Sequence, residues 1–219
     1  MNQPLFTQFL DLACGAFLLA AVMVLWFREL SAIVRVFALQ GVALAGIGVL
    51  LGIRQHHWVL VGVAVGIGAL RAGLLPYLMR RALERSGQQR ESEPLVNVAA
   101  SLLLAAVLTL LAYASAQPLV ALEPGPAAEA IPVGFAVVLI GFFTLITRRR
   151  AVAQMVGFLL LDNGITAVAL LATSGVPLIL ELGVSFDLLL AVLVLQLLAL
   201  RIQAAFGGTD LDTMRELRD

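Results

Sequence analysis

The chain contains continuous apolar runs that are each long enough to cross the hydrocarbon core of a lipid bilayer. Such a crossing needs about 20 helical residues, with a rise of about 1.5 Å each. The runs lack the alternation of apolar and polar positions that is typical of a transmembrane β-barrel. The sequence therefore predicts an all-α membrane protein with about seven transmembrane helices. The predicted spans cover residues 5–27, 31–53, 57–79, 95–116, 131–147, 151–173 and 177–203, and the short fifth span can begin earlier, within 118–132.

The composition agrees with this fold class and excludes several functions. Apolar residues make up 61% of the chain and charged residues 13%, against roughly 45–50% and about 25% in soluble domains. The single cysteine, Cys14, excludes a disulfide framework, a cysteine-ligated zinc site and a self-contained iron–sulfur cluster. The formal net charge is zero, so nothing in the charge balance indicates a nucleic-acid partner.

The positions of the arginines predict the orientation of the chain. With seven spans and the N-terminus outside, twelve arginines fall on the inner side, against Arg54 outside and Arg71 within the membrane. The positive-inside rule therefore predicts an N-out, C-in topology. The three arginines at 148–150 are interpreted as part of this signal, with a patch that docks anionic lipid or a partner as the alternative.

Ionisable residues inside the spans are the strongest functional signal, because each costs at least about 2.5 kcal/mol at the centre of a membrane helix. Three residues qualify, namely Arg71, Asp162 and Asp187. The two aspartates lie about 12 residues before and after the turn at 174–177, so both are expected about 18 Å from that turn, near the midplane. Burial disfavours the charged form of a carboxyl group, which makes both aspartates candidates to gain and lose protons. The alternatives are ion binding and a helix–helix hydrogen bond that only stabilises the bundle.

Polar neighbours favour the proton-path interpretation of Asp162. Gln154, Asp162 and Thr166 fall on one face of the sixth span at multiples of four residues, and Asn163 adds an amide beside the carboxylate. On the seventh span Glu181 lies only four residues past Pro177. It is interpreted either as an interfacial residue or as the second relay carboxylate in place of Asp187.

Arg71 requires a separate interpretation, because a guanidinium stays protonated and cannot carry a proton. It is interpreted as a fixed positive charge that biases a carboxylate or a partner subunit's relay, or else as a structural ion pair or a snorkelling side chain. Pro76 frees the backbone carbonyl of Ala72, which predicts a kink in the third span close to this charge. Gln40, midway along the second span, is the predicted neighbour of Arg71.

Several stretches of the chain carry a family resemblance. They are FALQGVAL at 37–44, ALRAGLLPYLM at 69–79, VGFLLLDNGITAVA at 156–169, ELGVSFDLLLAVLVLQLLALR at 181–201 and GGTDLDTMRELRD at 207–219. Together they resemble the membrane subunit called hydrogenase-4 component E, over nearly the whole chain. That family belongs to the membrane arm of group 4 nickel–iron hydrogenases, such as formate hydrogenlyases, which is similar to the proton-pumping arm of respiratory complex I.

The resemblance implies a division of the chain and a role for its buried carboxylates. It implies a four-helix region at 1–116, an outer loop at 117–130, a three-helix region at 131–203 that resembles the K-type subunit of complex I, and a cytoplasmic tail at 204–219. The K-type subunit carries two buried glutamates in a proton path. By position Asp162 would match the first and Asp187 the second, with Glu181 as the substitute for Asp187. Both matches are shorter by one methylene, and relatives can carry lysine at the place of Arg71.

The resemblance further implies a non-catalytic subunit of the bacterial or archaeal cytoplasmic membrane that contributes buried charges to proton translocation or coupling. No cofactor is expected in this chain, whereas a nickel–iron centre and iron–sulfur clusters are expected in partner subunits. The expected partners are antiporter-like large membrane subunits, a subunit like the complex I H-type anchor, and a soluble hydrogenase module. The alternatives are a subunit of a multisubunit cation/proton antiporter and a purely structural membrane scaffold.

Overall fold

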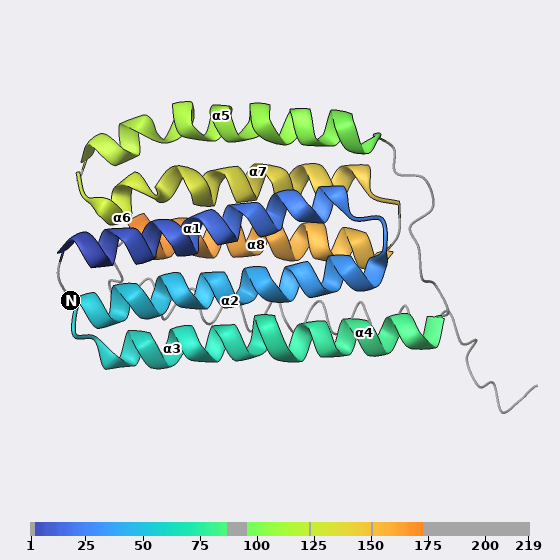
Figure 1. Cartoon of the computed structure of the whole chain (residues 1–219), viewed down its shortest axis with the longest axis horizontal. Coiled ribbons are helices and arrows are strands. Elements are labelled where there is room, and N and C mark those ends of the chain that lie inside the picture. The colour runs from blue at the N-terminus through green and yellow to red at the C-terminus, as the bar shows by residue number, and fades with distance from the viewer. Residues whose placement is uncertain (1–2, 87–95, 123, 150, 173–219) are drawn as a thin grey trace, which may run out of the picture.

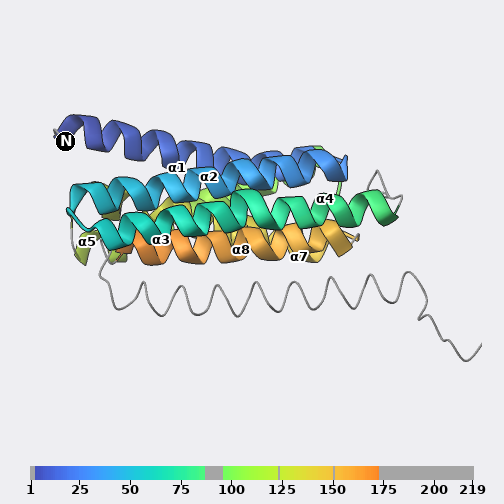
Figure 2. The same ribbon diagram turned by 90° about the horizontal axis from the view of Figure 1, so that it is seen from below.

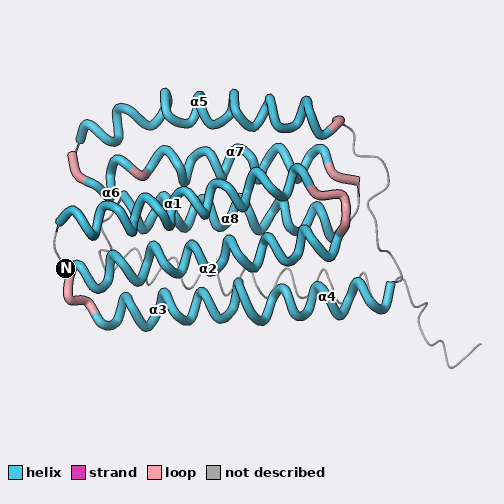
Figure 3. The backbone as a smooth tube through the Cα atoms, viewed as in Figure 1, coloured by secondary structure: helices cyan, strands magenta, loops and turns pink. Residues whose placement is uncertain are grey.

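The structure is a computed structural model that describes residues 3–86, 96–122, 124–149 and 151–172, all of them helices or short connections without a strand. The chain order is easily followed in the tube of Figure 3. The elements are α1 (Gln3–Trp26), α2 (Leu30–Arg54), α3 (Trp58–Gly68), the π-helical turn η1 (Ala69–Leu74), α4 (Leu75–Ser86), α5 (Val98–Leu122), α6 (Pro126–Glu129), α7 (Ile131–Thr147) and α8 (Ala151–Ala172).

Within these described residues six helices are long and apolar enough to cross a membrane, which confirms the first six predicted spans. The fourth span, α5, extends beyond its predicted end at residue 116 and continues through Pro118 to Leu122. The fifth span begins at Pro126, where the short helix α6 leads into α7, which agrees with the earlier start predicted within 118–132. The seventh predicted span, at 177–203, lies outside the described residues. The orientation stays a prediction.

The helices lie roughly parallel or antiparallel to one another in one bundle (Figures 1 and 2). The most extensive contacts join α7 to α8, α1 to α2, α5 to α7 and α2 to α3. Figure 1 places α5 at one edge of the bundle and the continuous α3–α4 segment at the other, with α2 and α8 between them. The two tryptophans, Trp26 and Trp58, are exposed at opposite ends of the bundle, as expected of side chains that anchor a span at its two membrane surfaces.

Glycines allow α7 and α8 to pack with their backbones in contact. Gly134 and Gly141 are seven residues apart on α7, and Gly157 and Gly164 have the same spacing on α8. A Cβ atom on Gly141 would lie 3.0 Å from the carbonyl oxygen of Gly157, and one on Gly164 would lie 3.0 Å from that of Gly134. Small residues at such spacing are typical of close helix pairs in membranes. This pair fixes α8, which carries most of the candidate site.

The kink predicted in the third span is not observed, and a π-helical turn takes its place. Pro76 has no N–H to donate, and the six residues before Leu75 form η1, where the N–H of Leu75 bonds to the carbonyl oxygen of Leu70, five residues earlier. Figure 1 shows α3 and α4 following one another in line across this turn. Arg71 lies within it, so the side chain most expensive to bury sits where the helix geometry is locally altered.

Candidate functional site: a buried charge cluster

The candidate site lies about halfway along three helices. Gln40 is the eleventh of the 25 residues of α2, Asp162 is the twelfth of the 22 of α8, and Arg71 is the fourteenth of the 24 of the span Trp58–Arg81. Their exposed fractions are 0%, 5% and 2%. An amide, a carboxylate and a guanidinium therefore meet at the depth farthest from both ends of the bundle.

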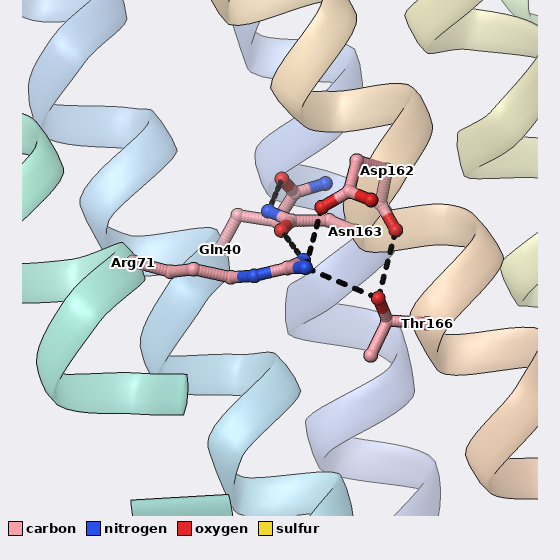
Figure 4. Close-up of polar contacts among 5 residues, drawn as sticks. All are labelled: Gln40, Arg71, Asp162, Asn163 and Thr166. Atoms are coloured by element: carbon pink, nitrogen blue, oxygen red, sulfur yellow. Dashed lines mark hydrogen bonds and ion pairs between the residues drawn. The ribbon is translucent and has the colours of Figure 1, made fainter. Parts of the chain in front are cut away.

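Arg71 binds three side chains of α8 (Figure 4). Its Nη2 forms an ion pair with Oδ2 of Asp162 and also donates to the hydroxyl of Thr166 at 3.1 Å, while its Nη1 donates to Oδ1 of Asn163. The Thr166 hydroxyl in turn donates to the backbone carbonyl of Asp162 at 3.0 Å. Both terminal nitrogens of the guanidinium are used, which fixes the plane of the group as well as its position.

The hydrogen-bonded chain continues from Asn163 to the second helix. The Nδ2 of Asn163 donates to Oε1 of Gln40 at 2.8 Å, between two fully buried side chains. Gln40 is thus part of the cluster, as its depth predicts, but it reaches Arg71 through Asn163. The cluster joins α2, η1 and α8, which are brought together from segments about 120 residues apart in the chain.

A single glycine allows the backbone around Arg71 to approach α2. A Cβ atom on Gly41 would lie 2.9 Å from both the nitrogen of Ala72 and the carbonyl carbon of Arg71. A larger residue would therefore push η1 away from α2. Gly41 follows Gln40 directly, so the same turn of α2 supplies both the close approach and the polar partner.

The charges of Arg71 and Asp162 cancel within the cluster, and this pairing makes their burial possible. Removing two ions from water costs several kcal/mol for each ion, and only close contact together with further hydrogen bonds offsets that cost. Here the carboxylate has the guanidinium, and the guanidinium has two more acceptors. The ion pair is compatible with two interpretations of Arg71, a fixed charge that biases a carboxylate and a structural ion pair, whereas a snorkelling side chain does not fit its burial at mid-depth.

Comparison with known proteins identifies two levels of relationship. The chain is 51% identical over 220 residues to "Uncharacterized protein Rv0085" of Mycobacterium tuberculosis, over the full length of both proteins. The chain belongs to the Rv0085 family. It is also 28% identical over 145 residues to hydrogenase-4 component E of Escherichia coli K12, covering 66% of this chain and 67% of that protein, and the Shigella flexneri protein of the same name matches equally. No family model and no solved structure matches the chain.

These relatives support the resemblance drawn from the residues at a distant level. The chain is a distant homologue of hydrogenase-4 component E, a component named for a hydrogenase, and has the helices of a multi-pass membrane protein. In the described part of the chain, no group of three or more histidine, cysteine, aspartate or glutamate side chains is placed to hold a metal ion. The cluster at Arg71 is thus the polar feature of the described bundle that most needs a functional explanation.

The structure separates one predicted site residue from the others. Gln154 belongs to the same face of α8 by sequence spacing, but its Nε2 donates to the backbone carbonyl of Arg148 at 2.9 Å, in the turn between α7 and α8. It lies about two helical turns from Asp162, and its side chain bonds to this backbone carbonyl instead of to the cluster. Thr166 and Asp162 are brought together with Arg71, whereas Asp187 and Glu181 lie outside the described residues.

The structure also shows a second buried arginine whose role the sequence did not reveal. Arg148 is 4% exposed, and its Nη2 donates to the carbonyl oxygens of Val24 and Leu25 at 2.9 and 3.0 Å. These carbonyls belong to the last turn of α1, where no later N–H of the helix can reach them. The sequence suggested only a topology signal for this residue, because backbone carbonyl partners leave no trace in side-chain patterns.

Proposed function

We propose that this chain is a non-catalytic membrane subunit of a hydrogenase complex similar to hydrogenase-4, and that its buried charge cluster contributes to proton translocation or coupling. The observation that carries the proposal is the Arg71–Asp162 ion pair at mid-depth in the bundle. A carboxylate at that depth is expensive to retain, and a role in a proton path is the usual reason for retaining one. The distant similarity to hydrogenase-4 component E supplies the kind of complex.

The geometry suggests how a proton would act in this cluster. Arg71 stays charged, so the group that titrates is Asp162. A proton on the Asp162 carboxylate cancels the charge that holds the guanidinium, and therefore proton and guanidinium compete for the same group. Asn163 and Thr166 also accept hydrogen bonds from Arg71 and do not lose their acceptor atoms when Asp162 takes up a proton. Each proton that arrives at Asp162 thus changes the field that Arg71 exerts on its surroundings.

The proposal includes a seventh span at 177–203 and an N-out, C-in orientation. In the described bundle Arg28, Arg35, Arg80, Arg81 and Arg149 lie at the end where α1 finishes and α8 begins, and Arg54 lies at the opposite end. This asymmetry supports the orientation through the positive-inside rule. A reporter fused after Asp219 is expected in the cytoplasm and one inserted at Gly125 outside. A cytoplasmic reporter at Gly125 would overturn the topology.

The proposed partners are antiporter-like large membrane subunits, an anchor subunit like the complex I H-type subunit, and a soluble hydrogenase module that carries the nickel–iron centre and iron–sulfur clusters. The test is purification of the tagged chain in mild detergent, followed by metal analysis. Nickel together with iron in the purified complex supports a hydrogenase. A complex of antiporter-like subunits without either metal would instead favour the cation/proton antiporter, and the chain alone would favour a scaffold.

A charge-neutral double variant separates a proton role from a purely structural ion pair. Asp162→Asn alone removes the carboxylate that forms the ion pair with a buried guanidinium, so its loss of activity cannot distinguish the two roles. Arg71→Gln combined with Asp162→Asn removes both charges and leaves amides that can bond to one another. A structural pair predicts recovery of both assembly and proton-coupled turnover in the double variant. We expect recovery of assembly with coupling still lost, and coupling preserved in Asp162→Glu.

A further inference from the structure

The end of the hydrogen-bonded chain in the cluster is an amide group without an acceptor. The Nε2 of Gln40 is fully buried and has no hydrogen-bond partner among the described residues. Burying an amide donor without an acceptor costs about 1–3 kcal/mol, and native proteins avoid it in the great majority of cases. An acceptor is therefore required at this place.

The chemistry of Arg71 fixes which end of each amide points where. A guanidinium only donates hydrogen bonds, so the atom of Asn163 that it meets must be the oxygen. The nitrogen of Asn163 then faces Gln40, whose oxygen must accept. Reversing either amide would place two donors or two acceptors in contact. The last group of this hydrogen-bonded series, Nε2 of Gln40, is thus a donor, and its ligand must be an acceptor.

We propose that a single buried water molecule binds at Gln40 and bridges its Nε2 to the carboxylate of Asp162. Figure 4 shows the amide nitrogen of Gln40 on the side of its own side chain that faces Asp162. A carboxylate has about four lone-pair positions, so it accepts further bonds beside that from Arg71. A water oxygen accepts from the amide, and its hydrogen donates to the carboxylate. Two polar partners meet the minimum that buried waters need.

A nearby cavity provides a contrast with the place next to Gln40. One helical turn beyond Gln40 on α2, and about two turns beyond Asp162 on α8, a small cavity is lined by Leu44, Leu170 and five more apolar residues of α2 and α3. It offers no polar partner, and apolar cavities stay dry. The place next to Gln40 differs from this cavity because the amide of Gln40 and the carboxylate of Asp162 offer polar partners to a water molecule.

This water has a consequence that rests on the proposed function. If Asp162 carries protons, it exchanges them with the bridging water, because Arg71 cannot release one: a hydronium ion at this place passes its proton to the carboxylate and remains as water, and the reverse transfer regenerates it. Gln40 then acts as a positioning residue, which holds the water at a distance from which Asp162 can exchange with it.

The test is a structure of the purified complex at a resolution that shows ordered water. We expect density about 2.7–3.2 Å from Nε2 of Gln40 and within the same reach of the Asp162 carboxylate. A protein acceptor in that place, or an apolar contact with no density, overturns the proposal. The wild-type structure alone decides this, so the test does not depend on whether a variant assembles.

Gln40→Met then measures what the water does, since methionine keeps the length of the side chain without its donors. We expect the density to disappear and proton uptake in reconstituted vesicles to fall about tenfold or more per assembled complex. Gln117→Met is the matched control, because Gln117 is exposed on α5. If the water is present and the Asp162→Asn complex is still fully coupled, the water site is confirmed and the proposed function is rejected. If the water is absent, and the double variant Arg71→Gln with Asp162→Asn assembles but stays uncoupled, the water site is rejected and the proposed function is kept.

Discussion

The bundle buries two arginines and satisfies them in different ways. Arg71 lies at mid-depth and binds a carboxylate, an amide and a hydroxyl of α8. Arg148 lies at the end of α7 and binds two backbone carbonyls of α1. Both side chains are at most 4% exposed. Exposure alone therefore does not separate a functional arginine from a structural one, and the chemistry of the partners does.

The contacts of the two arginines differ in whether the partner group can change its charge. The carbonyls of Val24 and Leu25 cannot titrate, and a cation at the C-terminal end of a helix is favoured at every pH. Arg148 thus holds α1 to the α7–α8 turn permanently. The partner of Arg71 is a carboxylate, a group that can take up a proton, so under the proposed function this contact has two states. We infer that Arg148 contributes to stability and Arg71 to coupling.

The largest effect is expected from breaking the pair at Arg71. Asp162→Asn removes the carboxylate paired with a buried guanidinium and should lower the free energy of unfolding by about 3–5 kcal/mol. Adding Arg71→Gln should recover most of this loss, because the double variant removes both charges of the pair. Denaturant titration of the detergent-solubilised protein measures both. An equally unstable double variant would show that the two residues do not act as a pair.

A smaller effect, of the opposite functional kind, is expected at Arg148. Arg148→Met removes two charge-assisted hydrogen bonds to α1 and should cost about 2 kcal/mol of stability. Proton-coupled turnover per assembled complex should stay unchanged. Arg149→Met is the matched control, because the side chain of Arg149 is exposed and should contribute little to stability. Uncoupling in a fully assembled Arg148→Met complex would erase the distinction between the two arginines.

Moving Arg71 without changing its chemistry sharpens the comparison. In Gly41→Ala the new Cβ would overlap the backbone at Arg71 and Ala72, which should cost about 1–3 kcal/mol, partly offset by the gain of about 1 kcal/mol from alanine in a helix. The net loss of stability should be about 1 kcal/mol, with reduced coupling. Gly46→Ala lies on the same helix with nothing within 4 Å of the new atom and should be neutral or stabilising. Equal behaviour of the two variants would contradict the close approach at Gly41.

The sequence predicts the parts of this structure that depend on one helix at a time. Lengths of apolar runs gave the first six spans, and the cost of buried charge singled out Arg71 and Asp162 before any contact was known. The position of Gln40 midway along the second span correctly predicted that it lies at the depth of Arg71. The pairing itself was not predictable, because depth does not determine how each helix is rotated about its axis. Arg71 and Asp162 are 91 residues apart, and nothing local relates their faces.

Other features were hidden for physical reasons. Spacing put Gln154 on the face of Asp162, yet a glutamine close to a helix start finds a nearer acceptor in the preceding turn. The π-helical turn at Arg71 and the role of Arg148 both depend on backbone groups, which every residue carries alike. The equal depth of Asp162 and Asp187, and the choice between Asp187 and Glu181, stay predictions.

The smallest effect is expected at the end of α2, which provides a comparison for the helix end that Arg148 caps. There the chain satisfies its own carbonyls, since the N–H of His56 bonds to Ile53 and that of His57 to Gly52. This pattern requires a left-handed residue, and His56 has a φ of 58°. His56→Gly removes that strain at some cost in unfolded-state entropy and should stabilise by about 0.5 kcal/mol. His57, with a φ of −93°, is the matched control, because glycine there brings only the entropic cost. Thermal unfolding of the two variants should therefore shift in opposite directions, and a shift in the same direction would show that the turn is not strained at His56.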